Sequence, residues 1–287
     1  MAASASHQLG ELIGDFFELW IINYMRPFVT QKGYYLDYRH PRPARNLSRE
    51  VIGIDQNGNK HKLDIVVERD GSETQKGTPK AFIEMAWRRY VKHSKNKVQE
   101  IAGAILPLIS TYSREMPFYA AVLSGEFTDN ALKQLESQGF YVLYFNYAEM
   151  AEVFDTIDVS IRWQEDTSEA QLQRIADRLA NLSSRERNQL QNNFFSLQSV
   201  KLQSLVDELN RALDVVISEI IVTPVHGRSA VLRDIDSAVD YIQRYSEVAP
   251  RLPILRYEII VRYTGGMEYT MKCDDKRQAI RFLQQYR

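Results

Sequence analysis

The chain has 287 residues, with 36 lysines and arginines against 37 acids, and its formal net charge of −1 excludes binding to polyanions through overall charge alone. Hydrophobic residues make up 44% of the sequence and charged residues 25%, which is typical of a folded protein with one large domain or two smaller ones. The single cysteine, Cys273, excludes an intramolecular disulfide and suits a reducing cytoplasm, where we expect the protein. No apolar run is long enough for a membrane helix and no secretory signal pattern begins the chain, so no membrane partner is expected.

The first half of the chain alternates helical and strand-like patterns. Apolar residues recur at three- and four-residue steps over 8–30, which predicts a helix, and a short strand and a loop follow in 31–50. Two strand-like runs, 51–55 and 61–68, flank the turn Gln56-Asn57-Gly58-Asn59, so we expect a hairpin. The remaining predicted elements are a strand over 81–87, a helix over 95–111, a strand over 118–124, a helix over 130–137 capped by Asp129, and a strand over 140–145. This order implies an α/β fold with a mixed central sheet flanked by helices.

The character of the sequence changes after about residue 165. Residues 168–217 predict two helices broken near Ser183-Ser184, and an apolar seam from Leu202 to Val216 suits either core packing or a dimer contact. The tail predicts a strand over 219–224, a helix over 235–245, a hairpin around Gly265-Gly266 and a last helix over 276–286. We therefore expect a core over 1–160, a helical region over 161–218 and a small α+β domain over 219–287. No internal repeat is evident.

Two acids stand inside apolar strand segments of the first half. Asp64 lies within Lys62-Leu63-Asp64-Ile65-Val66-Val67, and Glu84 lies within Ala81-Phe82-Ile83-Glu84-Met85-Ala86-Trp87. A buried acid is costly unless it is paired or binds a metal, and two carboxylates held together repel each other unless a cation neutralises them. Mg²⁺ does this with few protein ligands, and Mn²⁺ is the alternative ion. An ion bound to phosphate also activates water and offsets charge on the leaving oxygen, so the pair predicts phosphodiester chemistry.

Basic residues gather in two places. The run directly after Glu84 contains Arg88, Arg89, Lys92, His93, Lys95 and Lys97 with no acid among them, and Gln99 adjoins it. A second stretch contains Arg39, His40, Arg42, Arg45 and Arg49. Local basic surface on a neutral protein is what a groove that follows phosphates requires, although a solvated charged face is the alternative. Trp87 and Tyr90 are candidates either for stacking on bases or for the core.

This constellation resembles the PD-(D/E)XK nuclease superfamily, the fold of many type II restriction enzymes and some repair nucleases. In that family an Asp on the second core strand is followed, on the third strand, by an acid, one residue and a Lys, and then by a helix and two further strands. Asp64, Glu84 and the elements up to the strand at 140–145 match this order, so the resemblance covers roughly residues 8–155. It implies that Asp64 and Glu84 bind the metal and that an acid of the first helix, Glu18 or Glu11, joins them.

The chain departs from the family at one catalytic position, because Ala86 stands where the Lys is expected. In some family members the Lys comes from a neighbouring helix or strand. Lys97, at the start of the next helix, is our first candidate for that role, with Lys92 and Arg88 as rivals. Arg88 shares the strand face of Glu84, but an Arg stays charged and therefore suits a phosphate clamp better than a proton shuttle. The missing Lys also admits an inactive protein that only binds.

The resemblance implies a Mg²⁺-dependent endonuclease that acts on DNA in restriction or phage defence, as a homodimer so that both strands are cut. The catalytic set would be Asp64, Glu84, Lys97 and Arg88, the metal ligands Asp64, Glu84 and Glu18, and the DNA contacts Arg88, Arg89, Lys92, His93, Lys95 and Gln99. The alternatives are a nucleic-acid-binding protein without chemistry and a repair or junction-resolving nuclease. The sequence has neither a Gly-rich phosphate loop nor a dinucleotide fingerprint, so we expect no nucleotide cofactor.

Overall fold

The computed structural model describes residues 4–224, 227–246 and 256–286, with the exception of the side chain of His93. The chain divides into two compact units between Leu209 and Asn210. Among the described residues, no helix is both long and apolar enough to cross a membrane.

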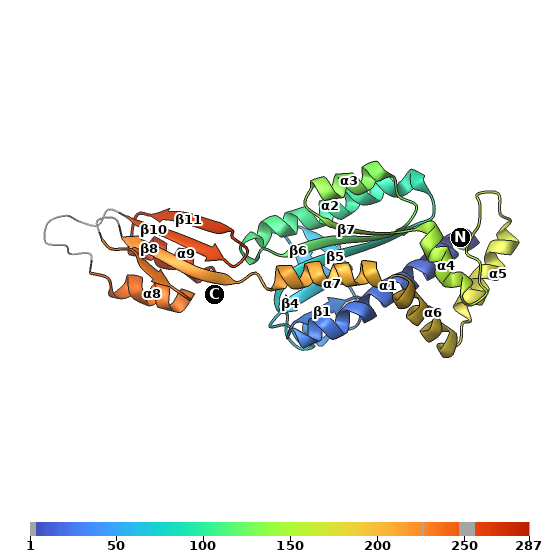
Figure 1. The fold of residues 1–287 in the computed structure, drawn as a ribbon, viewed down its shortest axis with the longest axis horizontal. Helices are drawn as coiled ribbons and strands as arrows, with labels where there is room; N and C mark the ends of the chain where they lie inside the picture. Colours follow the sequence, from blue (N-terminus) through green and yellow to red (C-terminus); the bar gives the residue numbers. More distant parts are fainter. Residues whose placement is uncertain (1–3, 225–226, 247–255, 287) are drawn as a thin grey trace. The chain divides into compact units, whose positions relative to one another are not determined.

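The first unit is built on a five-stranded sheet with the strand order β1-β4-β5-β6-β7 (Figure 1). Its strands are β1 (Tyr35–Tyr38), β4 (Ile65–Arg69), β5 (Thr78–Arg88), β6 (Phe118–Gly125) and β7 (Tyr141–Asn146). β4 pairs antiparallel with β1 and β5, whereas β5, β6 and β7 run parallel. The predicted mixed central sheet flanked by helices is therefore confirmed.

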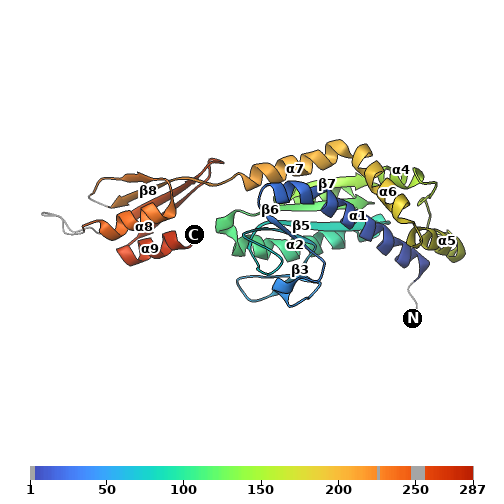
Figure 2. The ribbon, with the colours of Figure 1, turned by 90° about the horizontal axis from the view of Figure 1, so that it is seen from below.

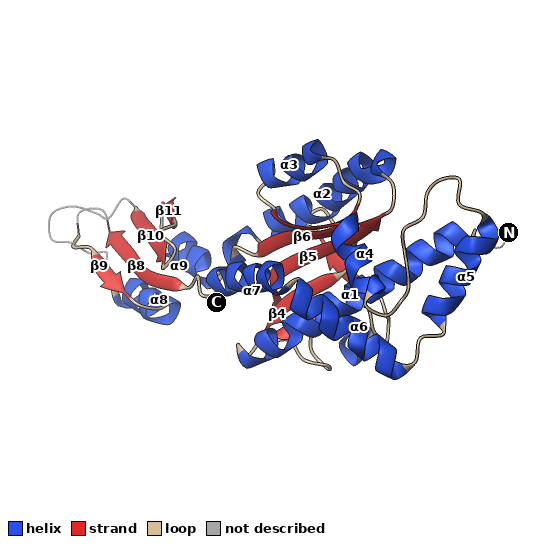
Figure 3. Cartoon of the chain, turned by 45° about the vertical axis from the view of Figure 1, so that its right-hand side comes forward, coloured by secondary structure: helices blue, strands red, loops and turns tan. Residues whose placement is uncertain are grey.

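Helices cover both faces of this sheet (Figure 3). One face packs on α2 (Ser94–Thr111) and α3 (Asp129–Ser137), through Val98, Ile101, Ile105 and Leu135. The N-cap of α3 is Thr128, whose side chain accepts a hydrogen bond from Ala131 N, so the predicted Asp129 cap was one residue late.

The other face packs on α1 (Ala5–Gln31). The apolar side of α1 meets aromatic side chains from β7, from α4 (Tyr147–Asp155), which was not predicted, and from α6 (Ser184–Leu197). Ring contacts join Phe17 to Phe145, and Trp20 to Phe154 and Phe194. This cluster fixes the helix that carries Glu18 against the sheet.

The segment after residue 165 forms three helices where two were predicted. They are α5 (Glu169–Ala180), α6 and α7 (Ser199–Leu213), and an additional break falls at Gln198, which caps α6. α5 packs on α1, and Phe194 of α6 is fully buried beneath it. The contacts thus group α5 and α6 with the first unit and not with a separate helical region over 161–218. The physical reason is that the apolar side of α1 must be buried against other elements.

The predicted hairpin is confirmed, and it has a consequence for Asp64. Strands β2 (Val51–Ile54) and β3 (Lys60–Leu63) pair with each other and pack on α2 (Figure 2), and the side chain of Asp55 accepts hydrogen bonds from Asn57 N and Asn59 N across the turn. The single strand predicted over 61–68 is wrong, since the chain leaves the hairpin after Leu63 and enters the central sheet at Ile65. Asp64 is the residue at this break.

Three short 3₁₀ helices complete the described part of the first unit: Pro43–Arg45, Val91–His93 and Ser113–Glu115.

The described residues of the second unit form an antiparallel sheet with the order β11-β10-β8-β9 and two helices. Its elements are β8 (Ile217–Pro224), β9 (Ala230–Leu232), α8 (Ile235–Arg244), β10 (Tyr257–Tyr263), β11 (Glu268–Cys273) and α9 (Lys276–Gln284), of which β9 was not predicted.

An internal repeat underlies the second unit, contrary to the expectation from the sequence. The four residues Glu-Ile-Ile-Val occur at 219–222 in β8 and again at 258–261 in β10, and each is followed by a second strand, an Asp N-cap and a helix. In the sheet, Ile220 pairs with Val261, and the equivalent pair, Val222 with Ile259, also occurs. A twofold axis between β8 and β10 would generate this register, so the unit consists of two similar β-β-α halves.

Candidate functional site

Asp64 and Glu84 are brought together by the pairing of β4 with β5. In this ladder Ile65 pairs with Ile83, so the residues next to them, Asp64 and Glu84, lie side by side at the end of β4. The backbone N–H of Asp64 donates to Glu84 Oε1 over 3.2 Å, and the N–H of Met85 donates to Asp64 Oδ2 over 2.7 Å. The predicted pair is thus held in a fixed geometry by hydrogen bonds from peptide groups.

Burial makes this pair reluctant to ionise. It raises the pKa of Asp64, and it raises the pKa of Glu84, which is 5% exposed, well above the usual range. The negative charge of Asp64 raises the pKa of Glu84 further. Two buried carboxyl groups that raise each other's cost of ionisation favour a bound cation, and a divalent ion would neutralise the pair.

Two further acids approach the pair from α1. Burial and the charges of Asp64 and Asp15 raise the pKa of Glu18 to about 7. Asp15, one turn earlier on the same helix, was not predicted as a site residue, and its spacing of three residues from Glu18 is the signal that could have found it. Glu11, the alternative to Glu18, is exposed and forms an ion pair with His7 at 3.2 Å.

A cavity of about 570 Å³ opens beside the acids. Its walls come from one side of α1, from Arg39 after β1, from Asp64, from the end of β5 and from Lys97 on α2. Glu84 itself does not line the cavity. The cavity therefore brings together acids and bases that are far apart in the sequence.

The cations predicted to replace the family Lys separate into two groups. Lys97 lines the cavity, and its charge lowers the pKa of both Asp64 and Glu84, although it also lies 3.6 Å from Glu100. Arg88 lines the cavity too, with Nη1 donating to the carbonyl of Trp87. Lys92 does not line the cavity, and its Nζ is 3.2 Å from Glu165.

The residues predicted to contact DNA differ in their exposure and in their partners. Arg89 lines the cavity, but its guanidinium donates to the carbonyl of Trp163 and lies 4.1 Å from the ring centre of Tyr147, so it is largely committed to the core. Lys95 and Gln99 are exposed on α2.

The remaining candidates for contacts with nucleic acid are His93, Trp87 and Tyr90. The side chain of His93 lies outside the described residues. Trp87 is 7% exposed and Tyr90 is half-buried, with the guanidinium of Arg89 5.0 Å from the centre of its ring. Their burial therefore favours the alternative that both aromatics pack in the core over the one in which they stack on bases.

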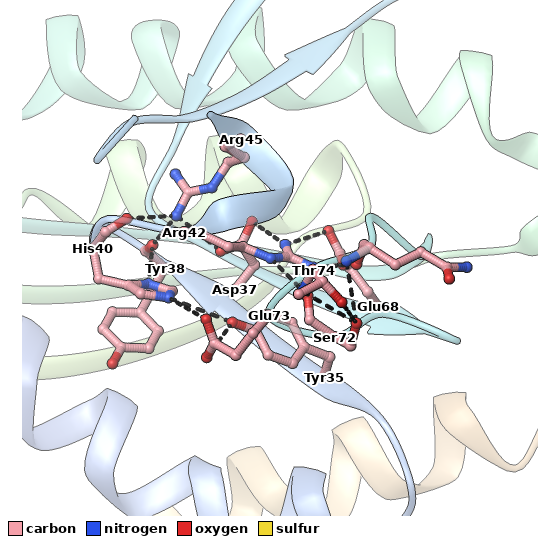
Figure 4. Close-up of polar contacts among 11 residues, drawn as sticks. Tyr35, Asp37, Tyr38, His40, Arg42, Arg45, Glu68, Ser72, Glu73 and Thr74 are labelled. Carbon is pink, nitrogen blue, oxygen red and sulfur yellow. Dashed lines mark hydrogen bonds and ion pairs between the residues drawn. The ribbon is translucent and has the colours of Figure 1, made fainter. Parts of the chain in front are cut away.

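The second basic stretch is mainly structural, which corrects its interpretation as a surface that follows phosphates. Arg42 is fully buried and bridges Asp37 at 2.7 Å and Glu68 at 2.8 Å, while buried Arg45 lies 3.1 Å from Asp37 (Figure 4). These guanidinium groups neutralise buried acids, so they stabilise the fold and do not form an exposed basic surface. Arg39 of the same stretch instead faces the cavity, and sequence reasoning missed it as a site residue.

The donor set can be tested against the predicted metal. Within the described parts of the chain, no group of three or more His, Cys, Asp or Glu side chains is close enough to hold a metal ion. Glu18 is therefore not placed as a direct third ligand. A pair of carboxylates fits Mg²⁺, which binds through one or two carboxylates and retains several waters.

Glu18 leads to a prediction on pH dependence. Its folded-state pKa of about 7 is raised from 4.5, so it weakens the fold as the pH rises from 4.5 to 7 and by a constant amount above that. In EDTA, Glu18→Gln is expected to stabilise the first unit at pH 8 by roughly 1–3 kcal/mol and to change little at pH 4.5. Thermal unfolding at both pH values measures this, with exposed Glu11→Gln as the control on the same helix. An equal gain at both pH values would contradict it.

No protein-family model and no curated protein matches the chain. Among solved structures, one described as the crystal structure of a protein of unknown function, AF1548, aligns with 66% of this chain and 99% of its own length, at 12% sequence identity and a TM-score of 0.28. A likeness this small leaves the function to be argued from the site itself.

Proposed function

We propose that the chain is a metal-dependent nuclease that hydrolyses phosphodiester bonds in DNA. The observation that carries the proposal is the pair Asp64 and Glu84, which peptide hydrogen bonds hold together, with Asp64 and Lys97 lining the same cavity. Raised carboxyl pKa values beside a cation in a cavity are typical of a functional site. The resemblance of these residues to the PD-(D/E)XK pattern supports the same conclusion.

Each residue has a distinct role in this proposal. Asp64 and Glu84 hold the divalent ion, which when bound would polarise the phosphate and lower the pKa of an attacking water. Lys97 takes the place of the family Lys and orients that water, because it lines the cavity and its charge lowers the pKa of both acids. Arg88, at the edge of the cavity, stabilises negative charge on the phosphate.

The wider biological assignment rests on the family resemblance. A role in restriction or phage defence, with a homodimer that cuts both strands, is the proposal that follows from it. The second unit would supply specificity or dimer contacts. A repair or junction-resolving nuclease would use the same acids and differ in the DNA structure that it cuts.

The test is cleavage of supercoiled plasmid by the full chain with Mg²⁺, with Mn²⁺ and with EDTA. We expect nicked or linear product with either metal and none in EDTA. Parallel reactions on linear duplex, branched and single-stranded DNA separate restriction from repair. DNA binding without cleavage, and without any stabilisation by Mg²⁺, would overturn the nuclease and favour the protein that only binds.

A further inference from the structure

Arg39 occupies a defined place opposite Asp64. The antiparallel ladder of β1 and β4 pairs Asp37 with Val66 and Tyr38 with Ile65. One further step along the same register sets Arg39 against Asp64. The position is consistent with electrostatics, since the charge of Arg39 lowers the pKa of Asp64 and also that of Glu18.

Arg39 differs from the other cations of the cavity in its hydrogen bonds and ion pairs. Lys97 lies within ion-pair distance of Glu100, Arg88 donates to a carbonyl, and Arg89 is enclosed by aromatic rings. Arg39 is exposed to the cavity and has no hydrogen bond or ion pair with any residue that the structure describes. Its guanidinium fork is therefore available to a ligand.

The backbone around Arg39 is fixed from beneath by Arg45. One nitrogen of the Arg45 guanidinium donates to the carbonyl of Tyr38 over 3.0 Å and to the carbonyl of His40 over 2.8 Å, so it holds the residues on both sides of Arg39 (Figure 4). Asp37, which also pairs with buried Arg42, anchors Arg45 in turn. Because the buried guanidinium of Arg45 is hydrogen-bonded to the carbonyls on both sides of Arg39, it restricts the backbone position from which the Arg39 side chain extends.

The chemistry of the cavity indicates what Arg39 binds. Asp15, Glu18 and Asp64 line the same wall, and they repel an anionic substrate. An Arg suits phosphate because its planar fork donates two parallel hydrogen bonds to phosphate oxygens. We propose that Arg39 binds a backbone phosphate of DNA at this site and that Arg45 is its positioning residue. This inference rests on the proposed function, since it takes nucleic acid as the substrate.

The test measures binding apart from cleavage. A short fluorescein-labelled DNA duplex is titrated with the full chain in Ca²⁺ in place of Mg²⁺, at several salt concentrations. Arg39→Gln is expected to weaken binding roughly 10- to 100-fold and to reduce the slope of log K against log salt by about one. Arg39→Lys restores the slope but only part of the affinity, because the fork is lost. The control is Arg49→Gln, which removes a charge from an exposed position of the same stretch that does not line the cavity. We expect it to keep the wild-type slope.

Arg45 is tested through Arg39. Arg45→Met is expected to weaken binding as Arg39→Gln does, and the double variant to be no weaker than Arg39→Gln alone. If Arg45→Met does not fold, Arg45→Lys retains the buried charge beside Asp37 and is expected to give a several-fold loss that vanishes in the Arg39→Gln background. A purely structural role for Arg45 would instead weaken binding equally in both backgrounds.

The outcomes separate the two proposals. Arg39→Gln that binds like Arg49→Gln, or a wild-type chain that binds no DNA, overturns the phosphate clamp. A wild-type chain that cuts DNA while Arg39→Gln binds normally overturns the clamp and leaves the nuclease intact. Binding that depends on Arg39 without any cleavage in Mg²⁺ overturns the nuclease and leaves the clamp.

Discussion

Asp64→Asn and Glu84→Gln are each expected to lower the rate of Mg²⁺-dependent DNA cleavage by roughly 10²–10⁴-fold, because each removes a carboxylate worth several kcal/mol of transition-state stabilisation through the ion. Both substitutions are nearly isosteric and preserve the hydrogen bond that the side-chain oxygen accepts from a peptide N–H. Single-turnover cleavage at saturating enzyme measures the chemical step apart from DNA binding. Glu136→Gln, at an exposed position of α3, is the matched control and should cut at the wild-type rate.

The same variants report on the protein without its metal. Because the pKa of Glu84 is raised by burial, its ionised form weakens the fold, so Glu84→Gln is expected to unfold at a higher temperature than the wild type in EDTA at pH 8. Mg²⁺ should then stabilise the wild type and not the variant. Cleavage that survives both Asp64→Asn and Glu84→Gln would sink the proposed active site, whatever the stability data show.

Arg42→Met is expected to destabilise the first unit by about 3–5 kcal/mol, since it leaves Asp37 and Glu68 buried without their main partner. Arg42 also donates to the carbonyls of Ser72 and Gln75, over 2.6 and 2.7 Å, so the loop between β4 and β5 loses an anchor as well. For a unit of this size the loss corresponds to a fall of about 6–20 °C in the unfolding temperature.

The control for Arg42→Met is Arg49→Met, which removes the same charge from an exposed position of the same stretch. We expect it to change stability by less than about 0.5 kcal/mol. If Arg42→Met lowered the free energy of unfolding by less than about 1 kcal/mol, the buried network would be contradicted. Removing a guanidinium that bridges two buried acids should cost more, because it leaves their charges uncompensated.

Local patterns accounted for most of the elements of the first unit. The three- and four-residue spacing of apolar residues located α1 and α2 to within a few residues, and Asn57-Gly58 located the hairpin. Local patterns did not predict two features of the fold. The strand around Asp64 changes from one sheet to another, and the repeat in the second unit is hidden because few positions beyond Glu-Ile-Ile-Val are identical between its halves.

The candidate site shows the same division between sequence and structure. Asp64 and Glu84 could be predicted, because an acid inside an apolar strand stands out in any single segment. Arg39 and Arg45 could not be told apart, since both are arginines in one basic stretch. Burial decides between them, because the guanidinium of Arg45 lies beside buried Asp37 of β1, whereas Arg39 is exposed and lines the cavity.

Local periodicity and polarity were enough to predict the mixed sheet with its flanking helices, the acid pair and the presence of nearby cations, because these are properties of short segments. Which of the cations reach the pair depends on tertiary contacts. Arg39 follows the last β1–β4 pair, Tyr38 with Ile65, and lines the cavity; Lys97 reaches the cavity from α2, and Arg42 is buried in the core. The physical reason is that register and burial are set by contacts between segments that are distant in the chain, and these contacts decide whether a charge is free for a ligand or consumed by the fold.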